Sequence, residues 1–193
     1  LPARSTIWEG RRTETGFESI DPGNGSPLLA CIGMRACDVA GLARLDTVFG
    51  HCSGGRTRST GPRSSENVAD YCARRRNAFI VGIQCIEAGD NCFCRSVGSG
   101  PRIEAGCDLV VTELPGKDGP SFLLESLSAS GAEVLKGLSV SPARDDDIHR
   151  ADRLLQECGA GMSKVLDVSG IQELLDRQWE CRRWDETAER CLT

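Results

Sequence analysis

The stretch AFIVGIQC, residues 78–85, decides the fold, because it is apolar, rich in β-branched residues and ends on a cysteine. A short continuous apolar run of this kind is typical of a strand buried at the centre of a sheet. Two further apolar runs, LLACIG at 28–33 and CDLVVTEL at 107–114, predict neighbouring strands. The second is followed by the turn GKDGP, 116–120, and a partner run at 121–125, which together predict a hairpin.

Helical patterns lie between and after these strands. Apolar residues recur every three positions over 38–49, with Asp38 as the expected N-cap. The other expected helices are at 67–76, 129–138, 145–158 and 168–184. The predicted fold class is therefore α/β (α+β): a small mixed sheet with flanking helices, followed by a helical C-terminal arm.

Composition narrows the class of protein. Hydrophobic residues make up 39% of the chain and charged residues 26%, which is sufficient for a folded core. The net charge is −5 and there is no basic stripe with interleaved aromatic residues, so a nucleic-acid groove is not expected. No apolar stretch approaches the roughly 18 residues that a membrane span requires.

Eleven cysteines in 193 residues are the unusual feature. Disulfides suit short secreted chains, and the N-terminal segment has no apolar signal-peptide core. Zinc prefers paired Cys-x2-Cys motifs, and the chain has none. An iron–sulfur cluster tolerates irregular spacing of its thiolates. Composition and spacing alone leave a cluster, a metal site and ordinary free thiols all open.

The segment CIEAGDNCFCRSVGSGP, residues 85–101, places three cysteines at a strand end and in a glycine-rich loop. Strand ends are where α/β sheets place ligands, and glycines let backbone N–H groups approach a cluster's sulfides. Cys37 also follows a strand and opens a helix, whose N-terminus favours a thiolate. The candidate ligand set is therefore Cys37, Cys85, Cys92 and Cys94.

Other residues near these motifs have simpler interpretations. Cys31 lies within an apolar strand and is expected in the core, and Cys107 is expected to be a packing residue. Cys158 and Cys181 lie on predicted helices and are expected to be structural. Asp38 is a conceivable oxygen ligand, but its role as a helix cap is the simpler account.

Three segments resemble the iron–sulfur β subunit of soluble sulfhydrogenases, a group that includes the corresponding iron–sulfur subunit of anaerobic sulfite reductase. They are GMRACD at 33–38, RRRNAFIVG at 74–82 and the cysteine segment at 85–101. The first family motif typically reads Gly-Val-Arg-Pro-Cys-Asp, so Met34 and Ala36 depart from it. Neither departure removes a proposed ligand.

The resemblance implies a non-catalytic electron-transfer subunit with a [4Fe–4S] cluster on the four candidate cysteines. Its implied partners are a flavin/NAD(P)-binding reductase subunit, together with a catalytic subunit, either a hydrogenase or a siroheme reductase. Its implied location is cytoplasmic. Residues 1–128 would form the α/β cluster-binding domain. Residues 129–193 would form a helical arm leading into an absent ferredoxin-like dicluster domain, in a chain truncated at both ends. Cys191 would then be the first ligand of a truncated ferredoxin-type cluster.

Two other functions remain open from the residues themselves. The same cysteines could hold zinc in a structural or docking module of a multisubunit complex. A stand-alone enzyme has less support, since His51 and His149 are the only histidines. Cys52 adjoins His51, but adjacent residues rarely face each other productively.

Overall fold

The computed structural model describes residues 9–20, 28–49 and 66–190, and within them it contains two sheets. A two-stranded antiparallel hairpin pairs β1 (Glu9–Thr13) with β2 (Gly16–Ile20). The larger sheet has the order β3-β4-β5-β6, in which β3, β4 and β5 are parallel and β6 is antiparallel. Its strands are β3 (Leu29–Met34), β4 (Ala78–Ile83), β5 (Leu109–Leu114) and β6 (Ser121–Ser126). The predicted mixed sheet and its hairpin are confirmed.

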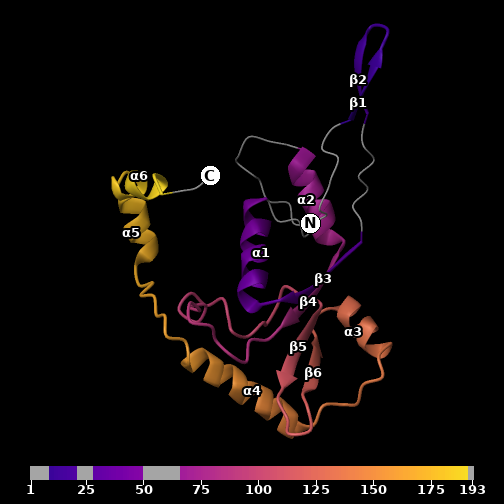
Figure 1. Ribbon diagram of the computed structural model, residues 1–193, viewed down its shortest axis with the longest axis vertical. Helices are drawn as coiled ribbons and strands as arrows, with labels where there is room; N and C mark the ends of the chain where they lie inside the picture. The colour runs from indigo at the N-terminus through magenta and orange to yellow at the C-terminus, as the bar shows by residue number, and fades with distance from the viewer. Residues whose placement is uncertain (1–8, 21–27, 50–65, 191–193) are drawn as a thin grey trace.

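Helices flank the four-stranded sheet and continue beyond it. Figure 1 shows α3 and α4 beside β5 and β6, whereas α5 and α6 stand away from the sheet. The helices are α1 (Ala36–Val48), α2 (Glu66–Arg76), α3 (Ala129–Lys136), α4 (Asp145–Ala160), α5 (Ile171–Arg177) and α6 (Arg183–Ala188). The α/β class is confirmed. None of the helices described here has the length and apolarity needed to cross a bilayer.

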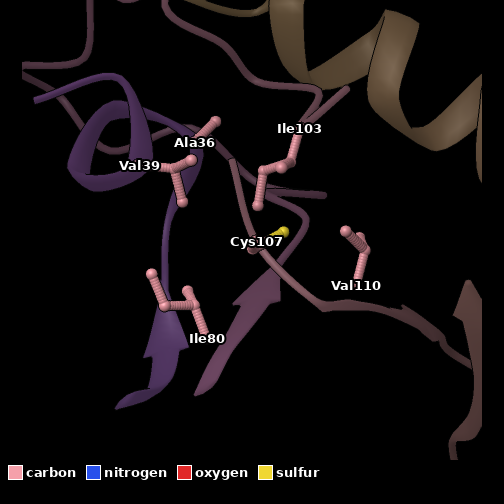
Figure 2. Close-up of a cluster of buried hydrophobic side chains, with 6 residues drawn as sticks. All are labelled: Ala36, Val39, Ile80, Ile103, Cys107 and Val110. Atoms are coloured by element: carbon pink, nitrogen blue, oxygen red, sulfur yellow. The ribbon is translucent and has the colours of Figure 1, made fainter. Parts of the chain in front are cut away.

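The main core lies between the sheet and the first turn of α1. Figure 2 shows its six buried side chains, with the Cys107 sulfur lying among them. The members are Ala36, Val39, Ile80, Ile103, Cys107 and Val110. Gly82 belongs to the same region, because an added Cβ would lie 2.6 Å from Ile103 Cδ1. The central strand is thus packed closely against the segment that follows residues 85–101, which we call the cysteine loop.

A second core cluster joins α4 to the hairpin. Leu114 and Leu123 pack with Ala151 of α4, and Leu154 packs against them. The sequence pattern assigns this helix to the C-terminal arm, whereas the structure packs it on the sheet. The domain boundary between residues 128 and 129 stays a prediction.

The start of α1 differs from the expected one. The helix begins at Ala36, with Arg35 as its N-cap, so the prediction of Asp38 as N-cap is wrong. Asp38 is the third helical residue instead, and its carboxylate accepts a hydrogen bond from the Arg35 backbone N–H at 2.9 Å. It still stabilises the helix start, because it satisfies a donor that the helix itself leaves unpaired.

The helix expected at 168–184 is divided into α5 and α6, and neither helix buries a residue. Trp179, expected in register with the apolar face, lies outside both helices and is 78% exposed. Isolated helices this short gain little without packing, so periodicity alone does not sustain one long helix here. The hairpin at 9–20 is not among the predicted elements, because its described side chains are exposed and carry no buried alternation.

Candidate metal centre

The four predicted cysteines come from three segments at one edge of the sheet. Cys37 lies in the first turn of α1, Cys85 lies just beyond the end of β4, and Cys92 and Cys94 lie on the loop that follows. Strands β3 and β4 are parallel neighbours, so their carboxyl ends meet at the same edge. Cys37 is exposed, and the other three are half-buried.

The four sulfur atoms are close enough to influence one another's ionisation. Burial raises the pKa of the Cys94 thiol, and the charges of Cys37, Cys85 and Cys92 raise it further. Burial likewise raises the pKa of Cys85, and Cys37 and Cys92 add to that effect. The structure therefore places all four predicted cysteines near one another, and a thiolate formed at one of them makes ionisation of Cys85 and Cys94 less favourable.

The start of α1 opposes this effect. The positive charge of Arg35 lowers the pKa of Cys85, and a backbone hydrogen bond from Ala36 lowers it as well. For Cys94, a backbone hydrogen bond from Arg95 acts in the same direction. Helix N-termini and backbone N–H groups stabilise anions, so these contacts offset part of the upward shift in the pKa of Cys85 and Cys94, which burial dominates.

Gly100 allows the cysteine loop to approach α1 closely. Its φ of +154° lies in the region that favours glycine, and an added Cβ would lie 2.8 Å from the Ala36 Cβ. The same Cβ would lie 3.1 Å from Cys94 Sγ. A side chain at this position would therefore separate the loop from the helix that carries Cys37.

The end of α4 covers another side of the site, which the sequence pattern does not indicate. Met162 is buried, and its Sδ lies 3.8 Å from Cys94 Sγ. Cys158 is 4% exposed; burial, followed by the charges of Cys85, Cys94, Cys92 and Glu87, raises its pKa to about 11. Cys158 is expected to be a structural residue, and its surroundings include three of the candidate ligands.

Hydrogen bonds attach this end of α4 to the cysteine loop. Arg95 Nη1 donates to the carbonyl oxygen of Gly159 at 3.1 Å, which satisfies a carbonyl near the helix C-terminus. Ser163 Oγ donates to the carbonyl oxygen of Asp90 at 3.3 Å. The helix end and the loop therefore form one connected surface around the sulfurs.

The remaining cysteines show mixed outcomes. Cys107 is buried, as expected. Cys31 is exposed, so its predicted core position is wrong, because β3 is the edge strand and most of its residues are exposed. Cys181 is half-buried. Cys191, Cys52 and His51 lie outside the described residues.

The four cysteines can be compared with the ligands that a single metal ion or an iron–sulfur cluster requires. In the described part of the chain, no group of three or more His, Cys, Asp or Glu side chains is placed to hold one metal ion. A [4Fe–4S] cluster is larger than a single ion and takes four cysteine thiolates, one at each iron. Four converging thiols with backbone N–H donors beside them fit that requirement.

Comparison with known proteins agrees with the motif-based resemblance. Over 171 residues the chain is 28% identical to sulfhydrogenase 2 subunit beta of Pyrococcus furiosus. The matched region covers 88% of this chain and 46% of that relative, so the chain spans about half of the relative's length. No family model and no solved structure matches the chain. The predicted resemblance is confirmed for the sulfhydrogenase β subunit.

Proposed function

Because this chain is related to the β subunit of sulfhydrogenases, we propose that it is a non-catalytic electron-transfer component of an oxidoreductase complex. It carries one [4Fe–4S] cluster on Cys37, Cys85, Cys92 and Cys94. The observation that supports this proposal is the convergence of these four thiols from three separate segments. Only Cys92 and Cys94 are close neighbours in the sequence, so the fold must bring Cys37 and Cys85 to them.

Each segment around the thiols has a definable part in this function. When bound, a [4Fe–4S] cluster accepts and returns one electron at a time. Arg35 and the N–H group of Ala36 offset negative charge at Cys85. Met162 and Cys158 exclude water on the α4 side, and solvent exposure is one of the factors that set a cluster's potential.

The partners follow from the same proposal. The relative's name identifies it as one subunit of a sulfhydrogenase. We place this chain between a catalytic subunit, either a hydrogenase or a siroheme reductase, and a flavin/NAD(P)-binding reductase subunit. A cytoplasmic location is part of the same proposal, as the family resemblance implies. Cys191, as the first ligand of a ferredoxin-type cluster, remains part of this proposal.

Metal and sulfide analysis tests the cluster assignment. The chain is purified or reconstituted without oxygen, and iron, acid-labile sulfide and zinc are measured. We expect a brown protein with roughly four irons per chain for the cubane site. Alanine substitution of any of the four cysteines should lower the iron content. Cys31→Ala is the matched control, because Cys31 is an exposed thiol on β3.

Two results would contradict the proposal. A colourless, iron-free chain after anaerobic reconstitution would exclude a cluster. Zinc bound without acid-labile sulfide, and lost on substitution of the same cysteines, would identify a structural zinc or docking module instead.

A further inference from the structure

Gln84 carries a buried amide whose hydrogen bonding is incomplete. The residue is 2% exposed, and its Oε1 accepts a hydrogen bond from the Ile103 backbone N–H at 2.8 Å. Its Nε2 is buried and has no hydrogen-bond partner within the described parts of the chain. The orientation of the amide is fixed, because a backbone N–H can only donate and must therefore face the oxygen.

An unpaired donor in this position is costly. Leaving a buried polar group unsatisfied destabilises a protein by about 1–3 kcal/mol, and native structures retain few such groups. An acceptor that belongs to a bound group would remove this cost. The unpaired Nε2 therefore indicates an acceptor beyond the polypeptide's own oxygen atoms.

The amide lies where the candidate metal centre is assembled. Gln84 directly precedes Cys85, and it continues the series of buried alternate positions that Ile80 and Gly82 form along β4. That face of β4 packs against the first turn of α1, where Ala36 begins the helix. Ile103, which holds the amide oxygen, belongs to the same core cluster as Ala36 (Figure 2).

The neighbouring sulfurs come from the same segments. Cys85 receives a backbone hydrogen bond from Ala36, and Cys37 is the next residue of that helix. The buried Gln84 amide is held by Ile103, and Ile103 shares a core cluster with Ala36, which begins the helix that carries Cys37. A bound cluster would bring sulfur atoms to this location, and a sulfur atom can accept the hydrogen bond that Gln84 Nε2 lacks.

We propose that Gln84 Nε2 donates a hydrogen bond to a sulfur atom of the bound cluster, and that Gln84 is a positioning residue that helps to set its reduction potential. The inference rests on the proposed function. A reduced cluster carries one more negative charge than an oxidised one, so a hydrogen bond to sulfur favours the reduced form and raises the potential.

Pulsed EPR on the reduced cluster tests the contact directly. Protein labelled with nitrogen-15 in the glutamine side chains should show a hyperfine coupling that disappears in Gln84→Glu. This variant keeps the oxygen that Ile103 requires and removes the N–H donors. A redox titration should show a lower midpoint potential for the variant. Gln172→Glu makes the same chemical change on the exposed surface of α5 and should leave both the coupling and the midpoint unchanged.

The outcomes separate this inference from the proposed function. A wild-type chain with a full complement of iron but no glutamine nitrogen coupling overturns the role of Gln84, as does an unchanged midpoint in Gln84→Glu. A chain that assembles no cluster overturns the proposed function instead. The coupling in the wild-type protein decides the question even where the variant folds poorly.

Discussion

Met162 Sδ lies 3.8 Å from Cys94 Sγ, although 68 residues separate the two in the sequence. The contact places the end of α4 against the cysteine loop. Cys158 lies about one helical turn earlier and is also buried. Because Met162 and Cys158 are both buried, we expect this side of the site to be shielded from water.

Met162→Ala should weaken that shield. We expect a loss of stability of about 2 kcal/mol, at the low end of the range for buried Met→Ala changes. Oxygen and water should then reach the cluster sooner, so its visible absorption should bleach several times faster in air. Met162→Leu preserves the apolar volume and should remain near wild type. Equal bleaching rates for the alanine variant and the wild type would show that α4 does not protect the site.

Gly100→Ala should displace the cysteine loop without replacing any of the candidate ligands. The new Cβ would lie within 3.1 Å of both the Ala36 Cβ and Cys94 Sγ, so the loop must move away from α1. We expect fewer irons per chain and a lower free energy of unfolding. Gly98→Ala is the matched control, since Gly98 also has a positive φ, +64°, but nothing lies within 4 Å of its added Cβ.

Backbone strain should affect both glycine variants, at roughly 1–2 kcal/mol each. Only Gly100→Ala should also reduce the iron content. Equal iron content in the two variants, whether at the wild-type level or reduced, would contradict the close approach of Gly100 to Ala36 and Cys94.

The strands are predictable because their signal is local. The run at 78–85 is apolar without interruption, and the structure buries it centrally as β4. The prediction for Cys31 is wrong because a short apolar run does not reveal whether its strand lies at the centre or the edge of a sheet. The helix predicted at 168–184 is too long because periodicity indicates an apolar face but not a surface to cover it.

The part of the candidate site that lies at the ends of strands can be predicted from the sequence. Cys37 and Cys85 both lie just beyond parallel strands, so topology alone brings them together. Cys158 of α4 and Met162, just beyond the end of that helix, are distant in sequence from the candidate ligands, and no local pattern specifies their approach. Gln84 does leave a signal: it is a polar residue inside an apolar run, and buried glutamines are uncommon.

Asp38→Ala should destabilise α1 without removing the cluster. The carboxylate accepts the Arg35 N–H at the helix start, and loss of such a capping interaction costs about 1 kcal/mol. Chemical denaturation should show this loss, and the iron content should stay at the wild-type level. Asp38→Asn retains an acceptor oxygen and should lose less stability. Iron loss in both variants, with folding intact, would instead make Asp38 a ligand.

Tyr71 links α2 to α1 and should make stability depend on alkaline pH. Its hydroxyl donates to Asp46 Oδ1 at 2.8 Å, and Arg75 Nε lies 3.1 Å from Asp46 Oδ2. Burial, followed by the hydrogen bond to Asp46 and the charge of Asp46, raises the pKa of Tyr71 from 10.0 to about 12. The folded state therefore holds this proton more tightly than the unfolded state does.

The resulting stabilisation is complete below pH 10 and is lost as the pH rises towards 12. Because Tyr71 is only partly buried, solvent screening reduces its contribution to about 1 kcal/mol. Tyr71 is the chain's one tyrosine, so the ultraviolet absorbance of its phenolate reports its ionisation directly. We expect a midpoint well above 10 in the folded protein and near 10 in denaturant. Tyr71→Phe should be less stable than the wild type at neutral pH, and the difference should shrink at alkaline pH. A folded-state midpoint near 10, or a difference independent of pH, would contradict the Tyr71–Asp46 link.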